Sequence, residues 1–198
     1  MPTDSLITLT ILAATAAFTP GPNNALVASS GVNFGYRRSL PHIMGIAFGF
    51  SAMIFIVGLF LGELFQRSLL LREILRWTGV ALLLFVAWKL ARSGGIGSKS
   101  GTPRPFKFVE AAAFQWVNPK GWAMAIAITA QFASDTASVQ TALIVALIFI
   151  VVGLTSASAW ALLGQSLRRW LDSPRRLSLF NHTMAVLIAA CVVMLFLD

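Results

Sequence analysis

The stretch Phe18-Thr19-Pro20-Gly21-Pro22-Asn23-Asn24 lies inside an otherwise apolar run that extends from Leu6 to about Ser30. Because proline has no N–H, Pro20 and Pro22 release the carbonyls of Ala16 and Phe18 from any helical ladder, and each disfavours helical backbone at the residue before it. Gly21 permits a sharp bend, and the two asparagines bring amides that donate and accept. The stretch therefore predicts a broken helix, and in a membrane such a break persists only beside protein or a water-filled cavity.

The composition is that of a membrane protein. The chain has 198 residues, of which 57% are hydrophobic and only 11% charged, whereas soluble domains carry about 25% charged residues. The formal net charge of +8 would suggest nucleic acid in a soluble protein. Here the basic residues fall between apolar runs and are not interleaved with aromatic residues, so we expect a lipid bilayer as partner and no nucleic acid.

Few residues are available for cofactor or catalytic chemistry. The chain has two histidines and one cysteine, Cys191, which excludes an intramolecular disulfide and argues against a zinc or iron–sulfur site. No Ser/His/Asp set and no phosphate-binding glycine loop stands out. The N-terminus lacks the basic region of a cleaved signal peptide, so we expect the first apolar run to be retained. The sequence predicts a protein that is not an enzyme and that holds no metal or cofactor.

The hydropathy pattern predicts an all-α, polytopic integral membrane protein with a single membrane domain over 1–198. A spanning helix needs about 20 mostly apolar residues, and six runs qualify. A Gly-, Ser- and Pro-rich linker, 93–107, divides the chain into two units of three spans each, 1–92 and 108–198. The alternative is five spans with a re-entrant first run. The six runs are 6–30, 40–62, 70–92, 108–132, 139–162 and 178–197.

The basic residues predict the orientation of these spans. They concentrate in or beside the first, third and fifth loops, and the opposite side carries only Arg67, Arg72 and Arg76, close to Glu63 and Glu73. Because cytoplasmic loops carry the excess of Lys and Arg, loops one, three and five are predicted to be cytoplasmic and both termini periplasmic. The basic residues of those three loops are Arg37, Arg38, Lys89, Arg92, Lys99, Arg104, Lys107, Arg168, Arg169, Arg175 and Arg176.

Three spans in each half make the halves antiparallel in the membrane, as in the inverted repeats of secondary transporters, where corresponding broken helices mark the site. The fourth run has a second break, Phe114-Gln115-Trp116-Val117-Asn118-Pro119-Lys120-Gly121, which again combines proline, glycine and amides after an aromatic residue. We therefore predict a 3+3 inverted repeat with spans 1 and 4 broken. The alternative is two unrelated proline kinks.

Lys120 is the sharpest candidate for function because it lies about 18 Å into the fourth span, where a charge is costly. It could hold a substrate carboxylate, donate to the carbonyls freed at the first break, or carry a proton; the structural alternative is a lysine that reaches an interface or caps carbonyls. The nearby amides could recognise a zwitterion or only join helices. The predicted substrate-binding residues are Thr19, Pro20, Gly21, Pro22, Asn23, Asn24, Gln115, Asn118, Pro119 and Lys120.

Two further groups have weaker signals. The candidates for proton coupling besides Lys120 are His42, His182, Glu63 and Glu110, which lie near the ends of spans and are more often solvated interface residues. Small residues at four-residue spacing predict close helix packing, and these are Gly45, Gly49, Gly58, Gly62 and, on the fifth span, Gly153.

Taken together, the motifs resemble a known family. Thr19-Pro20-Gly21-Pro22-Asn23-Asn24, followed by Gly35-Tyr36-Arg37-Arg38-Ser39 and Gly45-x-x-x-Gly49, resembles the N-terminal signature of the lysine-exporter (LysE) translocators, and Asn118-Pro119-Lys120 resembles the signature of their second half. The resemblance covers essentially the whole chain. It implies secondary-active export of amino acids or related metabolites across the bacterial inner membrane by proton antiport.

Within that family, the paired asparagines and Ser29-Ser30 look most like the cysteine/O-acetylserine exporters, which implies a small neutral substrate of the cysteine, O-acetylserine or homoserine kind. The absence of a central acidic residue in the sequence agrees with a neutral substrate. The alternatives are a non-transporting assembly factor or sensor, and a passive amino-acid channel. A homodimer is left open.

Overall fold

The computed structural model describes residues 1–61, 69–92, 104–132, 139–168 and 170–193, and every regular element in them is a helix. The predicted all-helical class is therefore confirmed for these residues. The helices are α1 (Thr3–Phe18), α2 (Pro22–Phe34), α3 (Tyr36–Ile56), the π-helical turn η1 (Val57–Leu61), α5 (Leu69–Arg92), α6 (Phe108–Gln115), α7 (Pro119–Phe132), α8 (Val139–Leu167), the 3₁₀ turn η2 (Trp170–Asp172) and α9 (Pro174–Val193).

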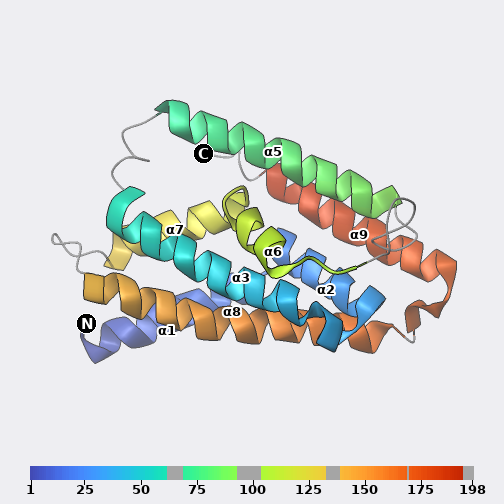
Figure 1. The fold of residues 1–198 in the computed structure, drawn as a ribbon, viewed down its shortest axis with the longest axis horizontal. Helices are drawn as coiled ribbons and strands as arrows, with labels where there is room; N and C mark the ends of the chain where they lie inside the picture. Colours follow the sequence, from blue (N-terminus) through green and yellow to red (C-terminus); the bar gives the residue numbers. More distant parts are fainter. Residues whose placement is uncertain (62–68, 93–103, 133–138, 169, 194–198) are drawn as a thin grey trace.

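The helices run along one common direction (Figure 1). α3 and α8 lie side by side across the molecule, and α5 pairs with α9 along its other edge. The C-terminal ends of α2, α5 and α8 all lie at the same end of the bundle, at the right of Figure 1, while α3 and α7 end at the left. Successive apolar runs thus alternate in direction.

Two helices are long and apolar enough to cross a membrane, Tyr36–Leu59 and Val139–Leu167. The pair formed by α1 and α2 passes the same test as a unit, so up to three membrane-spanning segments meet it among the described residues. The second run begins earlier than the predicted residue 40, because Gly35 adopts a left-handed φ of 77° at the N-terminus of α3. Pro41 and His42 therefore lie inside this helix rather than at its start.

The first apolar run is broken where the prolines predict it. α1 ends at Phe18 and α2 begins with Pro22 at its first position, and the two helices are bent by 58°. Proline suits that first position because its missing N–H has no intrahelical partner to lose. Between the helices Gly21 is fully extended, with a φ of −175°, and Thr19 N makes a last helical hydrogen bond to Thr15 O at 3.1 Å.

The fourth run is broken in the same way. α6 ends at Gln115, a tight turn follows in which Asn118 N donates to Gln115 O at 3.2 Å, and α7 begins with Pro119 at its first position. Each of the two broken runs thus resumes as a helix that starts on a proline.

The predicted packing glycines differ in their surroundings. Gly45 and Gly49 lie against α6, near Phe108 and Ala112, and Gly153 lies against Ala47 of α3. Gly58 is loosely surrounded, since an added Cβ would meet nothing nearer than 3.8 Å, and Gly62 lies outside the described residues.

The tightest glycine contacts occur between α2 and α8. A Cβ added to Gly31 would overlap the carbonyl oxygen of Ala161, and one added to Gly164 would overlap the carbonyl oxygen of Ala28. The two helix backbones therefore touch directly, which fixes α2 against α8 beside the first break.

Candidate functional site

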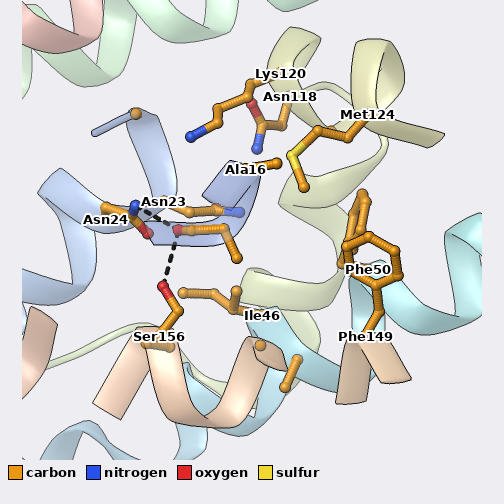
Figure 2. Close-up of a pocket in the computed structure, with 16 residues that line it drawn as sticks. Ala16, Asn23, Asn24, Ile46, Phe50, Asn118, Lys120, Met124, Phe149 and Ser156 are labelled. Atoms are coloured by element: carbon orange, nitrogen blue, oxygen red, sulfur yellow. Dashed lines mark hydrogen bonds between the residues drawn. The ribbon is translucent and has the colours of Figure 1, made fainter. Parts of the chain in front are cut away.

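The two helix breaks meet around one cavity (Figure 2). Most of its polar lining comes from the break in the first run and the break in the fourth, and α3 and α8 supply the opposite wall, which includes one serine. The cavity measures about 60 Å³, and one water needs roughly 10–15 Å³ by this measure, so it holds several waters or part of a small metabolite. The lining residues with polar side chains are Asn23, Asn24, Asn118, Lys120 and Ser156.

The carbonyl oxygens at the end of α1 are held by side chains from other elements. Asn24 Nδ2 donates to Ala17 O at 2.9 Å and to Thr19 O at 2.8 Å. Ser156 Oγ, from α8, donates to the same Ala17 O at 2.8 Å, and Figure 2 shows the two donors converging on it. Since Gly21 is extended, its N–H is not returned to Ala17 as it would be in a continuous helix, and this explains why that carbonyl accepts side-chain donors.

Lys120, the second residue of α7, reaches across to the first break. Its Nζ donates to Thr19 O at 2.5 Å and lies 3.5 Å from Pro20 O. The stem of the lysine fills the space beside Gly21, where an added Cβ would lie 2.8 Å from Lys120 Cδ. Glycine leaves room here for the lysine side chain. The backbone conformation does not itself require glycine, because any residue can adopt an extended backbone. The sequence predicted that Lys120 could donate to the carbonyls freed by Pro20 and Pro22, those of Ala16 and Phe18; in the structure it donates instead to those of Thr19 and Pro20.

Asn23 and Gln115 join the two breaks directly. Asn23 Nδ2 donates to Gln115 Oε1 at 2.8 Å, and Gln115 Nε2 donates to Asn23 Oδ1 at 3.2 Å and to Ala111 O at 2.8 Å. Gln115 is fully buried, so its amide depends on these partners. These two amides have the interhelical role that was the alternative to substrate recognition.

Asn118 differs from the other amides. Its side chain is only 2% exposed and lines the cavity, and its Oδ1 has no hydrogen-bond partner within the described ranges. A buried polar atom without a partner costs about 1–3 kcal/mol. Figure 2 shows this amide beside Lys120, at the N-terminal end of α7. Asn118 is therefore positioned to bind something that enters the cavity.

The remainder of the cavity is apolar. Phe50 of α3 and Phe149 of α8 stack edge to face with ring centroids 5.2 Å apart, and Ile46 and Met124 lie near them. The cavity thus has a polar end, formed by the two helix breaks, and an apolar end between α3 and α8. A molecule with a charged or polar head and an uncharged body fits this division.

The electrostatics of the polar end follow from the helix ends. The C-terminal end of a helix carries partial negative charge and favours cations, whereas an N-terminal end favours anions. The end of α1 and the start of α7 meet at the cavity, so it offers both within a short distance.

The candidates for proton coupling lie elsewhere, with the exception of Lys120. His42 is 2% exposed on α3, with its Nδ1 2.9 Å from Ser30 Oγ and its ring beside Phe106. His182 is exposed on α9, 2.7 Å from the carbonyl of Ser178. Neither histidine lines the cavity, and Glu63 lies outside the described residues.

Glu110 forms an exposed ion pair with Arg104 at 2.6 Å and accepts from Lys107 N at 2.9 Å, which caps the start of α6. The hydrogen bond from Arg104 to this carboxylate raises the pKa of the Arg104 guanidinium. Glu110 thus connects the start of α6 to the residues that precede it.

Sequence reasoning missed Ser156 as a site residue. A serine in an apolar span is normally assigned to helix packing, and only the crossing of α8 over the first break brings it to Ala17. The sequence analysis also did not identify Phe50, Phe149 and Met124 as cavity residues, because Phe and Met at helical spacing are typical of any protein core. No sequence signal identifies either.

Comparison with known proteins agrees with this architecture. The family model described as "LysE type translocator" matches residues 14–198. The chain belongs to the LysE family. The resemblance inferred from the proline, asparagine and lysine motifs is therefore confirmed. No solved structure matches this LysE family chain significantly.

Curated relatives of this LysE family member are efflux proteins. A "Cysteine/O-acetylserine efflux protein" of Klebsiella pneumoniae is 32% identical over 181 residues, 89% of this chain and 89% of its own length. A "Homoserine/homoserine lactone efflux protein" of Salmonella typhimurium is 29% identical over 187 residues, 92% and 89% of the respective chains. A "Cysteine/O-acetylserine efflux protein" of Salmonella choleraesuis is 28% identical, with 91% of both chains covered. The family and these relatives are transporters rather than enzymes.

Proposed function

We propose that this chain is a secondary-active exporter of small neutral amino acids or closely related metabolites, and that the cavity between the two helix breaks binds the substrate. The observation that carries this proposal is the meeting of the end of α1 with the start of α7 around one cavity. The cavity is lined by Lys120 and by Asn118, whose amide oxygen has no partner among the residues that the structure describes. An amino-acid head group carries one positive and one negative charge, and each helix end favours one of them.

The substrate class follows from the rest of the lining. The body of the cavity is formed by Phe50, Phe149, Ile46 and Met124, and the described lining contains no carboxylate that would pair a basic side chain. The small volume favours a short, uncharged side chain. Cysteine, O-acetylserine and homoserine, named for the relatives, are the first substrates to test, and the sequence resemblance to the cysteine/O-acetylserine branch agrees with them.

The proposed membrane arrangement is six spans in the bacterial inner membrane, built as a 3+3 inverted repeat of 1–92 and 108–198 around the linker 93–107. Two features support it. Each half begins with a run that resumes on a proline, at Pro22 and Pro119. The C-terminal ends of α2, α5 and α8, after which basic residues follow in the sequence, lie at one end of the bundle, which would be the cytoplasmic end.

Transport then proceeds by alternating access, coupled to proton antiport. The two breaks flank the substrate, and the halves rock against each other so that the cavity opens to one side at a time. The proposed site consists of Thr19, Pro20, Gly21, Pro22, Asn23, Asn24, Gln115, Asn118, Pro119 and Lys120, with Ser156 added from α8. Of these, Gly21, Asn23, Asn24, Asn118, Lys120 and Ser156 line the cavity, and the others lie in or beside the two breaks.

Inverted membrane vesicles test this proposal, because export from the cytoplasmic face is measured in them as accumulation. We expect uptake of at least one labelled substrate among homoserine, O-acetylserine and cysteine, and loss of that uptake when a protonophore collapses the proton gradient. Uptake that ignores the protonophore would indicate a passive channel. No movement of any amino acid would contradict the exporter.

The same vesicle experiment can test a single residue of the site. Lys120→Met should abolish uptake while the protein is still made and inserted, because it removes the cation from the polar end of the cavity. Lys107→Met, the same change at an exposed lysine away from the cavity, is the matched control. Wild-type uptake by Lys120→Met would remove this residue from the site.

A further inference from the structure

The carbonyl oxygens at the end of α1 accept two kinds of donor. Asn24 is 8% exposed and Ser156 is 2% exposed, and both are neutral groups held on short side chains. Lys120 reaches Thr19 O and Pro20 O from another helix, at the end of a four-carbon stem. The first two donors are fixed parts of the scaffold, whereas the third can move away by rotation about its own side-chain bonds.

The lysine head group is chemically the same as the ammonium group of an amino acid. Each is a compact, positively charged group with three N–H donors and no acceptor. The end of α1 adds the negative pole of a helix to the oxygens of Thr19 and Pro20. Any site that accepts the Lys120 ammonium therefore has the chemistry to accept a primary ammonium group from a substrate.

We propose that the carbonyl oxygens of Thr19 and Pro20 form the subsite for the substrate's ammonium group, and that Lys120 occupies this subsite in the empty carrier and leaves it when the substrate binds. This inference rests on the proposed export function and states how its site works. It places the substrate's ammonium group at the first break. It also gives Lys120 two positions, one on these carbonyls in the empty carrier and one away from them in the loaded carrier.

The second position follows from electrostatics. Two ammonium groups cannot share the oxygens of Thr19 and Pro20, because like charges at contact distance repel strongly in a partly buried site. The carboxylate of an amino acid brings the charge that Lys120 loses on leaving, and it would lie near the start of α7 beside Asn118. When the substrate binds, Lys120 leaves the carbonyl oxygens of Thr19 and Pro20 and pairs with the substrate's carboxylate. The substrate's ammonium group takes its place, so the two carbonyls always face one positive charge.

The docked position of Lys120 has a function in the empty carrier. In alternating access the empty protein must also reorient. Carbonyls at a broken helix end are costly to leave without a donor away from water. Lys120 supplies a cationic donor to Thr19 O and Pro20 O in the empty carrier, and the substrate's ammonium group supplies one in the loaded carrier. Gly21 supplies the room, because a Cβ there would lie 3.2 Å from Lys120 Nζ.

The inference predicts a specific pattern of ligand preference. Homoserine, 3-aminopropan-1-ol and 4-hydroxybutanoate share one skeleton, and the second lacks the carboxylate while the third lacks the ammonium. Wild-type protein should bind homoserine and not aminopropanol, since aminopropanol would have to expel Lys120 without offering it a carboxylate. Lys120→Met leaves the subsite without its internal cation, so aminopropanol should now bind.

Isothermal titration of the purified full chain in lipid nanodiscs, with each of the three probes, measures this. We expect Lys120→Met to gain affinity for aminopropanol by about tenfold or more, which is the scale of one hydrogen bond to a charged group, and to lose affinity for homoserine. Lys120→Ala, which also removes the stem, should show the same gain. The matched control Lys107→Met should behave as the wild type.

Two results would overturn the inference. One is a wild type that binds aminopropanol as tightly as the Lys120 variants do. The other is a pair of folded variants that lose homoserine without gaining aminopropanol, which would mean that Lys120 only holds the carboxylate and that the ammonium binds elsewhere. The second result leaves the export function intact. Conversely, the aminopropanol gain supports the subsite even if no amino acid is transported in vesicles, so the two proposals fail separately.

Discussion

Asn23 and Gln115, which are 92 positions apart in the sequence, exchange two hydrogen bonds of 2.8 Å and 3.2 Å between the two broken runs. Each amide uses its donor and its acceptor on the other. This reciprocal pair joins the first half of the chain to the second at the edge of the cavity, and it fixes the distance between the breaks that surround the proposed substrate.

The pair predicts a measurable coupling energy. Asn23→Ala leaves the Oε1 of fully buried Gln115 without its donor, so it should lower the free energy of unfolding by about 1–3 kcal/mol. In a double-mutant cycle with Gln115→Ala, the coupling should be about 0.6 kcal/mol and no more than about 1.7 kcal/mol, the average and the maximum for hydrogen bonds between membrane helices. Thermal unfolding in detergent measures it.

The control for this cycle is Asn33→Ala, because the Asn33 amide donates within α2, to the carbonyl and hydroxyl of Ser29, in the part of the chain that the structure describes. Combined with Gln115→Ala it should give additive losses. A coupling of zero between Asn23 and Gln115 would mean that the two breaks are held together by other contacts.

The breaks themselves were predictable, because proline chemistry is local. Pro20, Pro22 and Pro119 fix where helices must stop, and no tertiary contact can restore a missing N–H. The same local rule pointed to the carbonyls of Ala16 and Phe18. The structure instead shows side-chain donors on Ala17 and Thr19, because the extended backbone at Gly21 takes further N–H groups out of the ladder.

Long-range partners were not predictable for a physical reason. Ser156 meets Ala17 across 139 positions, and its role depends on how α8 crosses the first run. The contact of Gly31 with Ala161 was missed because the pattern sought was glycine at four-residue spacing on one helix. Here each helix contributes one glycine and one alanine, and the motif exists only once the two helices are packed.

That reciprocal contact gives a second prediction. Gly31→Ala or Gly164→Ala places a methyl group on the backbone carbonyl of the other helix, and backbone cannot rotate away as a side chain can. Each change should destabilise the protein by about 1–3 kcal/mol or more, as overpacking does, and should lower the midpoint of thermal unfolding.

Gly58→Ala is the matched control, because its new methyl group would lie 3.8 Å from Thr129 Oγ1 and 3.9 Å from Ala142 Cβ. Those are ordinary contact distances, and alanine also favours a helix over glycine by about 1 kcal/mol. We expect an unchanged or raised midpoint. Equal losses for Gly31→Ala and Gly58→Ala would mean that the α2–α8 contact does not limit stability.

Filling the cavity should separate transport from folding. Ala16 lines the cavity from α1 (Figure 2), and Ala16→Leu adds three carbon atoms to a space of about 60 Å³. We expect amino-acid uptake into inverted vesicles to fall at least about tenfold, while expression and the unfolding midpoint change little, since the added atoms enter empty space. Thr15→Leu, one position away on the exposed side of α1, should transport normally. Full activity in Ala16→Leu would place the substrate elsewhere.

The ion pair at the start of α6 should contribute to stability in a salt-dependent way. Arg104 and Glu110 are 49% and 42% exposed, so water and salt screen their attraction. Arg104→Gln should lower the unfolding midpoint slightly at low salt, and the difference from the wild type should vanish near about 1 M salt. Uptake should be unaffected, because neither residue lines the cavity.

Arg104 itself should add no pH dependence to that contribution. The Glu110 carboxylate raises the pKa of Arg104, and a raised pKa gives stability that is present at low pH and is lost only above the folded-state value. The ordinary pKa of arginine is already above about 12. The difference between wild type and Arg104→Gln should therefore stay constant between about pH 6 and pH 9, and a difference that disappears within this range would contradict the ion pair as the source.

The direction of the chain in the membrane gives the last prediction. The C-terminal ends of α2, α5 and α8, after which basic residues follow in the sequence, lie at one end of the bundle, and α1 begins at the opposite end. With six spans, the positive-inside bias places Met1 in the periplasm. A fusion of alkaline phosphatase ahead of Met1 should be active and a green fluorescent protein fusion dark, with the reverse pattern for fusions within the linker 93–107. A fluorescent fusion at Met1 would favour the five-span alternative, in which α1 and α2 enter and leave from the cytoplasmic side, and the two halves would then no longer be antiparallel.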